Sequence, residues 1–341
     1  MPEQYDKPDE TIWKPLTGLP HGAEIWSSSV YNNLVAEWHQ LHKQLTDKAV
    51  DRTILDIWLK ERKRLFAIET GQIEGLYTLK RGVTEQLITE GLEGAMSSHT
   101  VEDVDDTIIK GLLRDQETAL EIVFDEIKNN KPLTHAAIKA WHKLITHHQK
   151  TVPGVIREDK QLKHVLLPFE HKGKYKQKEN NPLRWDGILF EYCPPEHVQS
   201  EMDRLFSLYS DIRQQNLPTH IEAAWLHHRF VRTHPFQDGN GRIARLLMAY
   251  VYVRKGEIPP LIRAEARGLY IRALQQADRG NLMAFSEHLR ILATEQIENL
   301  ITVTKDILAG NQQLHHPNGG TTDKGVYHPP DKPETDYDLE P

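Results

Sequence analysis

The stretch HPFQDGNGR, residues 234–242, brings a histidine, an aspartate, two glycines and an arginine into nine positions. Apolar residues spaced three or four apart predict a helix on each side, the first ending near Thr233 and the second opening after Gly239. Pro235 ends the first helix because proline cannot continue a helical hydrogen-bond ladder. The sequence therefore predicts a short loop at a helix junction, with several polar groups close together.

The glycines of this loop predict an anion-binding cradle. In Gly239, Asn240 and Gly241, successive backbone N–H groups can turn toward one point at the start of the second helix, where the helix dipole favours negative charge. Arg242 and Arg245 lie three positions apart on the first turn and can add donors to the same anion. Taken singly these features are ordinary, because a lone GxG is usually a turn and such arginines usually face solvent.

Two further side chains complete the pattern. Asp238, directly before the cradle, is a candidate ligand for Mg²⁺ bound to phosphate oxygens. His234 can reach the mouth of the cradle, where a neutral imidazole would accept a proton from an incoming hydroxyl. A histidine before a proline is by itself more often a satisfied loop residue. The occurrence of all these groups at one junction favours a phosphate-binding catalytic site.

The composition is that of a globular protein without disulfides. The single cysteine, Cys193, fits a reducing compartment, and the start of the chain lacks the pattern of a secretory signal, so the cytoplasm is the expected location. No apolar run approaches the roughly 18 residues of a membrane span. The formal net charge of -7 argues against direct nucleic-acid binding. The histidine pairs lack the second ligand set of a zinc site.

Helical periodicity dominates the chain and predicts a mostly α fold. Two strand-like runs, LKHVLL at 162–167 and GILFEY at 187–192, flank a polar stretch and predict a β-hairpin with a long exposed tip. Thr219 and Glu222 have the spacing of a capping box at the start of a helix. We expect three regions: an N-terminal helical region, residues 1–100; a core that includes the hairpin at about 155–193, residues 101–310; and a disordered tail, residues 311–341.

The segment HPFQDGNGRIAR, residues 234–245, resembles the signature of the Fic (Fido) family, HPFx[DE]GNGRxxR, at every fixed position. The likeness extends over about residues 60–295, although Thr233 stands where relatives usually have an aliphatic residue. The resemblance implies a Fic-type helical bundle with a β-hairpin flap. It also implies transfer of AMP from ATP to a Ser, Thr or Tyr hydroxyl of a target protein, with release of pyrophosphate.

The same resemblance gives each residue of the motif a role. It makes His234 the general base and Asp238 the Mg²⁺ ligand, while Arg242 and Arg245 grip the β/γ end of ATP. The α- and β-phosphates are held by Gly239, Asn240 and Gly241. Relatives that phosphorylate carry a lysine in place of the second glycine, so this sequence favours adenylylation.

Tyr270 and Asp278 match the spacing, Tyr-x7-Asn/Asp, at which family members contact adenine. From the residues alone, Tyr270 is equally well a core residue, and Asp278 a solvated helix end. Both interpretations stay open at this point.

A second motif lies in FAIETGQIEGLYT, residues 66–78. As a bare pattern, Thr70 would be a helix N-cap and Gly75 a helix terminator, with Glu74 near the first turn. Beside the Fic-like motif it resembles the inhibitory helix of the family, [ST]xxxE[GN]. That resemblance implies that Glu74 pairs with Arg245 and occupies the group that should hold the γ-phosphate. We therefore expect an autoinhibited adenylyltransferase.

Two alternative functions stay open. In some relatives the same glutamate positions a water that removes AMP from the target, which would make this chain a de-adenylylase. The other alternative is a non-catalytic, nucleotide-sensing regulatory module. The expected partners are ATP and a target protein docked on the flap by strand pairing; no membrane is expected, and a homo-oligomer is left open. The polar insertion at the tip, residues 171–183, is either a tolerated loop or a contact surface for an acidic target region.

Overall fold

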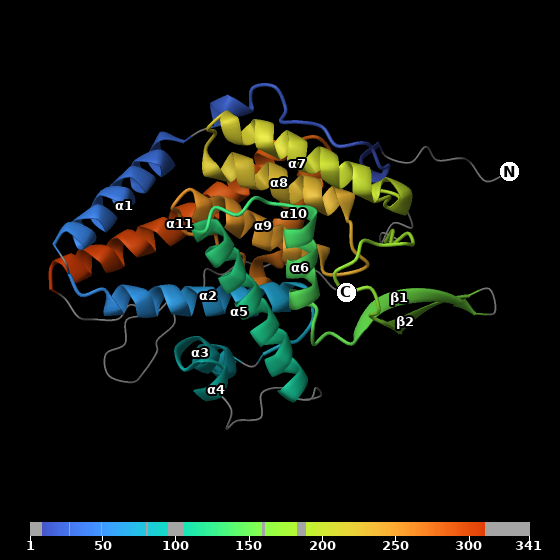
Figure 1. Ribbon diagram of the computed structural model, residues 1–341, viewed down its shortest axis with the longest axis horizontal. Coiled ribbons are helices and arrows are strands. Elements are labelled where there is room, and N and C mark those ends of the chain that lie inside the picture. Colours follow the sequence, from blue (N-terminus) through green and yellow to red (C-terminus); the bar gives the residue numbers. More distant parts are fainter. Residues whose placement is uncertain are drawn as a thin grey trace, which may run out of the picture.

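The computed structural model describes residues 9–26, 28–48, 50–79, 81–94, 106–158, 161–182 and 189–310. Within them the chain is mostly helical with one antiparallel pair of strands, as the sequence predicts (Figure 1). The expected tail, residues 311–341, lies outside the described part. The α-helices are α1 (Ser29–Asp47), α2 (Thr53–Ile73), α3 (Arg81–Thr89), α4 (Gly91–Gly94), α5 (Asp106–Lys128), α6 (His135–Ile145), α7 (Val198–Gln214), α8 (Thr219–Thr233), α9 (Asn240–Arg254), α10 (Arg267–Asp278) and α11 (Leu282–Leu308).

The pair of helices α8 and α9 forms the centre of the molecule, with α2, α5, α6, α7 and α11 packed around it (Figure 1). Every residue from Arg242 to Tyr252 in α9 is buried. A helix that is buried on all sides belongs in the core, and the apolar run of α9 explains its place there. The loop between α8 and α9 is therefore carried by the two most enclosed helices of the fold. None of the described helices combines the length and apolar character needed to span a membrane.

The segment before α1 is irregular apart from two 3-10 turns, Asp9–Thr11 and Ala23–Trp26. It is nevertheless packed against α8. The indole of Trp225 donates from Nε1 to Thr17 O at 3.1 Å, and Arg232 donates to Glu10 O at 3.2 Å. These contacts place the segment before α1 against α8, including its last turn, which directly precedes the loop. α2, from the expected N-terminal region, packs on both α5 and α11, from the expected core. The division of the chain into these two regions near residue 100 stays a prediction.

The hairpin is formed by other residues than those predicted. β1 (Thr151–Glu158) pairs with β2 (Gln161–Pro168), with Thr151 opposite Pro168 and Glu158 opposite Gln161. The strand expected at 162–167 is correct, but its partner precedes it in the chain. Of the strand expected at 187–192 the structure describes residues 189–192, which are irregular apart from a single bridge at Leu189. The bounds of the hairpin are therefore 151–168, not 155–193.

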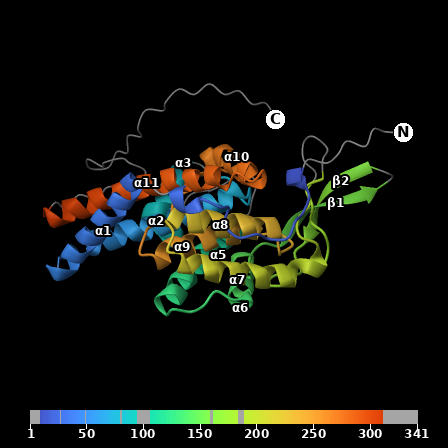
Figure 2. The ribbon, with the colours of Figure 1, turned by 90° about the horizontal axis from the view of Figure 1, so that it is seen from above.

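The physical reason is the short distance along the chain between the two strands. Only two residues separate β1 from β2, so closing the turn costs far less conformational entropy than closing a loop of about twenty. Pro153 lies inside β1, although proline cannot donate a backbone hydrogen bond to a neighbouring strand. A two-stranded hairpin has only edge strands, however, and proline is tolerated in an edge strand. The hairpin projects from the helical body (Figure 2).

Candidate active site

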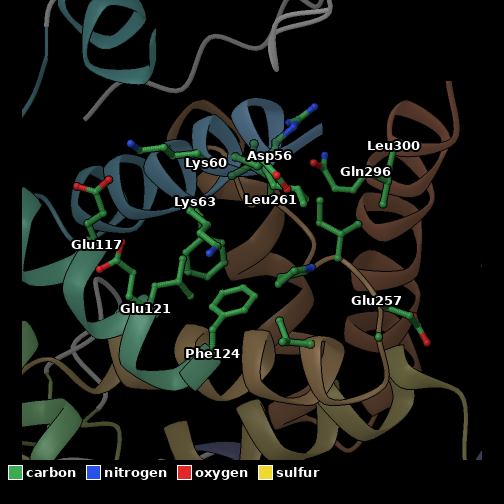
Figure 3. Close-up of a pocket in the computed structure, with 18 of the residues that line it drawn as sticks. Asp56, Lys60, Lys63, Glu117, Glu121, Phe124, Glu257, Leu261, Gln296 and Leu300 are labelled. Carbon is green, nitrogen blue, oxygen red and sulfur yellow. The ribbon is translucent and has the colours of Figure 1, made fainter. Parts of the chain in front are cut away.

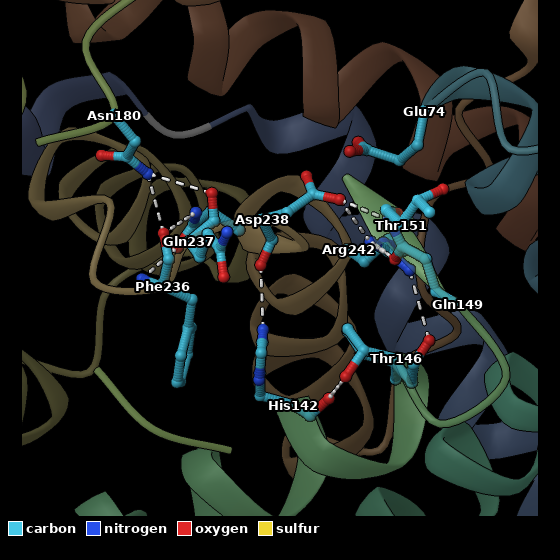
Figure 4. Close-up of polar contacts among 12 residues, drawn as sticks. Glu74, His142, Thr146, Gln149, Thr151, Asn180, Phe236, Gln237, Asp238 and Arg242 are labelled. Carbon is cyan, nitrogen blue, oxygen red and sulfur yellow. Dashed lines mark hydrogen bonds and ion pairs between the residues drawn. The ribbon is translucent and has the colours of Figure 1, made fainter. Parts of the chain in front are cut away.

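The loop between α8 and α9 is fastened by its own side chains (Figure 4). Asn240 Oδ1 accepts from Phe236 N at 2.9 Å, and Asn240 Nδ2 donates to Phe236 O at 2.8 Å. Phe236 is fully buried and stacks on His142 of α6, with ring centroids 3.8 Å apart. His142 accepts from Gly173 N through Nδ1 and therefore donates from Nε2 to Asp238 O, 2.9 Å away. The loop is thus rigid before any ligand binds.

His234 occupies the C-cap of α8 in a left-handed backbone conformation, with φ +46° and ψ +57°. Residues other than glycine adopt this region rarely. Nδ1 of His234 lies 3.2 Å from Val231 O. A carbonyl oxygen can only accept, so Nδ1 carries the proton and Nε2 is left with a free lone pair. Burial, assisted by the Lys176 ammonium, lowers the pKa of His234 to about 3. The imidazole is therefore neutral at pH 7, which a general base requires.

The sequence analysis did not identify the residues that enclose His234. Tyr192 stacks on the imidazole, with ring centroids 3.7 Å apart and ring planes 9° apart. Asn181 Oδ1 accepts from Tyr192 N at 2.9 Å and fixes this segment. Lys176 Nζ lies 5.8 Å from the centroid of the Tyr192 ring. No motif marks these residues, because their importance arises only from the way the chain folds back on the loop.

The polar stretch that follows the hairpin supports the same loop instead of forming an exposed tip. Lys176 N donates to Pro235 O at 2.8 Å, and Asn180 Nδ2 donates to Phe236 O at 2.8 Å (Figure 4). Lys176 is buried, with its ammonium on Asn180 Oδ1 at 2.8 Å. Burial lowers the pKa of Lys176 to about 8. The stretch 171–183 is therefore not the tip of the hairpin, whose second strand ends at Pro168. Several of its described residues, among them Lys174, Lys178 and Glu179, are exposed, and contact of this stretch with a target stays a prediction.

The N-terminus of α9 is covered by a carboxylate. Arg245 Nη2 donates to Glu74 Oε1 at 2.6 Å, so the expected pair is present. A Cβ atom added to Gly241 would lie only 2.4 Å from the same oxygen, which puts the carboxylate directly on the first turn of α9. The first backbone N–H groups of a helix have no partner within it, and they attract anions. Glu74 thus lies where the sequence predicts a phosphate cradle.

The position of Glu74 is set by the way α2 ends. Gly75 has φ +67°, Leu76 N donates to Gly71 O at 3.1 Å, and Gly75 N donates to Gln72 O at 3.0 Å. These two bonds form the Schellman motif, so the prediction of Gly75 as a helix terminator is confirmed. Thr70 lies inside α2 and is not an N-cap. Its carbonyl oxygen accepts from Arg245 Nη2 at 3.2 Å, which gives the guanidinium a second fixed partner.

Arg242 and Arg245 do not converge in this structure. Arg242 is fully buried and donates to Gln149 Oε1 at 2.6 Å and to Ile145 O at 3.2 Å (Figure 4). It also reaches Asp238 Oδ2 at 3.3 Å. Its guanidinium supports the link between α6 and β1, while Arg245 faces α2. A direct grip of Arg242 on phosphate stays a prediction.

Asp238 presents an ionised oxygen at the edge of the cradle. Burial opposes ionisation, but Arg242 and the Gln149 amide, which donates to Oδ2 at 2.7 Å, hold the pKa of Asp238 below its ordinary value. One or two carboxylates combined with substrate phosphates are the usual ligands of Mg²⁺ in nucleotide sites, so this residue fits that metal. In the part of the chain that the structure describes, no group of three or more His, Cys, Asp or Glu residues could hold a metal by itself.

Tyr270 and Asp278 lie on the α8 side of the same site. The Tyr270 hydroxyl is 2.9 Å from His227 Nε2, and the ring is buried in the core cluster. Asp278 Oδ1 is 3.0 Å from His228 Nε2 and 3.8 Å from Arg232 Nη1. Tyr270 is therefore packed and Asp278 is paired, not solvated. Contact of either residue with adenine stays a prediction.

Comparison with known proteins relates this geometry to one family. The Fic/DOC family profile matches residues 132–252, which include α6, α8, the loop and most of α9. Protein adenylyltransferase fic-1 from Caenorhabditis elegans is 31% identical over 116 residues, which are 34% of this chain and 23% of that protein. Protein adenylyltransferase Fic from Nematostella vectensis is 32% identical over 102 residues, 29% of this chain and 23% of that protein. The chain thus spans less than a quarter of the length of these curated relatives.

Solved structures extend the similarity beyond the matched region. A Fic domain containing signaling protein from Bacteroides thetaiotaomicron superposes with a TM-score of 0.64 at 25% identity, over 81% of this chain and 98% of that one. Fic-1 from C. elegans superposes with a TM-score of 0.59 at 20% identity, over 81% of this chain and 73% of that one. The fold is therefore shared over most of the length, including helices outside residues 132–252.

Proposed function

We propose that this chain, which contains a Fic/DOC domain, is an enzyme that transfers AMP from ATP to a Ser, Thr or Tyr hydroxyl of a target protein and releases pyrophosphate. One observation carries the proposal: the neutral imidazole of His234 lies beside a helix N-terminus whose first turn already holds an anionic group, the Glu74 carboxylate. The curated relatives that match over the motif are named protein adenylyltransferases, which supports the same reaction.

In this proposal the residues of the loop divide the chemistry between them. Nε2 of His234 accepts the proton of the target hydroxyl as its oxygen forms a bond to the α-phosphorus, and the bond to the pyrophosphate oxygen breaks. The N–H groups of Asn240 and Gly241 at the start of α9 stabilise the charge on the phosphates. Arg245 binds the terminal phosphate once Glu74 has left it. Tyr192 keeps the imidazole in one plane so that Nε2 stays directed at the hydroxyl.

Asp238 is the residue that would hold Mg²⁺ in this site. When bound, the metal neutralises phosphate charge and so favours attack at phosphorus. The contribution of the protein is an ionised Asp238 carboxylate kept in place by Gln149 and Arg242. Arg242 therefore acts through Asp238 in the present conformation.

Glu74 makes the described conformation an inhibited one in this proposal. The carboxylate occupies the guanidinium of Arg245 and the first turn of α9 at the same time. A triphosphate must displace it to bind with the α-phosphorus facing His234. Inhibition is thus competition between one carboxylate and one phosphate for the same donors.

We further propose that the target protein adds a strand to the hairpin. Among the described residues β1 and β2 form a sheet of two strands, so each has an outer edge to which a further strand could pair. Leu166 of β2 is 71% exposed, which provides an apolar contact beside such a strand. The hairpin projects from the same side of the body as the loop of the site (Figure 2).

The decisive experiment is mass spectrometry after incubation with magnesium-ATP. We expect an AMP adduct on the protein itself or on a lysate protein with Glu74→Gly, little with wild type, and none with Glu74→Gly/His234→Asn. Asparagine is the matched replacement because it tolerates the left-handed backbone of position 234. An equal adduct yield with and without His234 would exclude it as the base.

The reverse reaction is separated from the forward one by a target that already carries AMP. A de-adenylylase would release AMP from this target with wild-type protein and lose the activity in Glu74→Gly. An adenylyltransferase gains activity from the same substitution. A regulatory module without catalysis would bind ATP and give no adduct with any variant.

A further inference from the structure

A cavity of about 580 Å³ lies beside α2, away from the residues assigned to catalysis. Its walls come from the first two thirds of α2, from α5, from the turn after α9 and from α11 (Figure 3). The volume falls within the range of small-molecule sites, roughly 300–1,000 Å³. No residue of the loop 234–239 and none of the partners of Glu74 lines it.

The inner walls are apolar and aromatic, contributed by several helices that are distant in sequence. The lining includes Leu59 and Phe66 of α2, Leu120 and Phe124 of α5, and Leu261. Phe124 and Leu261 are labelled at the cavity in Figure 3. Such a lining binds a hydrocarbon or aromatic body through burial of apolar surface, worth about 25 cal/mol per Å². The ligand that fits is therefore largely apolar.

Lys63 is one of three cationic side chains in the lining, with Lys60 and Arg62, and its ammonium lies over these apolar walls. Lys63 Nζ is 4.6 Å from the centroid of the Phe124 ring and has no carboxylate within ion-pair distance among the described residues. The acids of the lining are differently placed. Glu117 pairs with Arg64 at 3.5 Å and Glu257 accepts from the Tyr31 hydroxyl at 2.5 Å.

The remaining acids of the lining, Asp56 and Glu121, are exposed to solvent at the rim. Solvent screens them, whereas the partly buried ammonium of Lys63 and the buried guanidinium of Arg62 both favour an added negative charge. The geometry points to a binding site for a small amphipathic anion. We propose that its apolar body fills the space between α2 and α5 and that its carboxylate lies on Lys63.

The occupant of this cavity also bears on Glu74, and this part of the inference rests on the proposed function. Phe66 in the wall and Glu74 at the end of α2 are eight residues apart, a rise of about 12 Å along one helix. The cavity is formed while Glu74 is on Arg245. A ligand that binds this arrangement more tightly than one in which Glu74 has left Arg245 stabilises it, so it strengthens the block and weakens binding of magnesium-ATP.

Titration calorimetry with decanoate, kept below its micelle concentration and without nucleotide, tests the site. We expect saturable binding to wild type and a loss of roughly tenfold or more in affinity for Leu59→Trp, whose indole fills the cavity. Lys63→Gln should weaken binding roughly fivefold, and the exposed Lys43→Gln on α1 should leave it unchanged. Thermal unfolding checks that each variant is folded.

The outcomes separate the site from its effect. Decanoate that does not bind wild type, or binds Leu59→Trp and Lys63→Gln as tightly, overturns the site. Magnesium-ATP is then titrated into His234→Asn protein with and without saturating decanoate, where we expect weaker binding that disappears in Glu74→Gly/His234→Asn. Unchanged ATP affinity overturns the coupling alone. Failure of the double variant to bind ATP at all counts against the proposed function and leaves decanoate binding to be judged by itself.

Discussion

Replacement of Glu74 by glycine removes one partner from a buried charge. Arg245 keeps the Thr70 carbonyl, the Tyr270 hydroxyl and the buried surroundings of α9, while its Nη2 bond to Glu74 Oε1 is lost. Burial works against the charge of Arg245, and Glu74 is the main cause that raises its pKa above the ordinary value. Without that carboxylate the guanidinium attracts another anion more strongly. Under the proposed function, the γ-phosphate of ATP is the anion that takes the place of this carboxylate.

The size of this effect follows from the geometry of the pair. The hydrogen bond is 2.6 Å long, and the side chains are 2% exposed for Arg245 and 21% exposed for Glu74. A hydrogen bond to a charged group is worth about 1.5–3 kcal/mol, and the partial exposure of the carboxylate reduces this to about 1–2 kcal/mol. At about 1.4 kcal/mol per factor of ten, magnesium-ATP should bind roughly 5- to 30-fold more tightly to the variant.

Calorimetric titration of magnesium-ATP measures this directly if turnover is prevented. We would compare His234→Asn with Glu74→Gly/His234→Asn, and use the exposed Glu265→Gln as a surface-charge control. Glu74→Gln should give part of the gain, because the charge is lost and the bulk remains. Equal dissociation constants for the first pair would refute the competition between carboxylate and phosphate.

Three further changes test other parts of the site. In the Glu74→Gly background, Gly241→Ala should weaken magnesium-ATP binding roughly tenfold or more, because its Cβ enters the space that the Glu74 carboxylate fills in the wild type. An unchanged binding isotherm would contradict the assignment of this space to a phosphate. Tyr192→Ala should lower the rate of AMP transfer roughly 10- to 100-fold with little change in ATP affinity, and Tyr192→Phe should retain the rate because the stacked ring remains. Burial lowers the pKa of His142 to about 4 and that of His234 to about 3 from the ordinary value of 6.5, so both are neutral in the folded chain at pH 7. Below pH 6.5 each histidine binds a proton in the unfolded chain but not in the folded one. The free energy of unfolding should therefore fall toward pH 4 by about 1.4 kcal/mol per pH unit for each group. A melting temperature that stays constant between pH 7 and pH 4.5 would disprove this.

The helix junction could be predicted because its signals are local. α8 ends at Thr233 and α9 begins at Asn240, where Pro235 and Gly239 indicated. Proline forbids continuation of one helix, and Gly239 adopts the left-handed conformation, with φ +79°, before the next. These are properties of single residues, and no tertiary contact needs to be known to apply them.

The capping box shows where local reasoning fails. Thr219 is the first residue of α8 and Pro218 is its N-cap, so the hydroxyl of Thr219 caps nothing and donates to Glu257 Oε1 at 2.5 Å. Glu222 is fully buried and pairs with Arg254 at 2.8 Å and with a neighbouring lysine. Thr219 therefore bonds to Glu257 in the turn after α9, and Glu222 pairs with Arg254 and Lys255 at the end of α9. The spacing alone could not show that these partners exist.

The surroundings of His234 were missed for a related reason. Lys176 and Asn180 lie in a polar stretch without helical or strand periodicity, which predicts an exposed loop, and Tyr192 ends the run 187–192, which predicts a strand. Burial of such residues depends on many backbone partners supplied by the loop 234–239, as in the bond from Asn180 Nδ2 to Phe236 O. Sequence patterns report amphipathic faces, and this segment has none. Its role could be found only from the folded chain.

The contact between Glu74 and Arg245 joins segments 171 positions apart in the chain. The family resemblance predicted this pair, whereas the residue pattern alone indicated a different helix end. As a bare pattern, Thr70 indicated an N-cap, which would have placed Glu74 at the start of a helix. The structure has the opposite direction: Glu74 follows the last turn of α2, and the Schellman motif at Gly75 fixes it there. A carboxylate at a helix C-terminus is disfavoured by the helix dipole. Its retention at that end is accounted for by Arg245 and by the positive N-terminus of α9, which together compensate a charge that α2 alone would repel. A carboxylate that is unfavourable at the end of its own helix thus indicates an interaction with another element, here Arg245 and the N-terminus of α9.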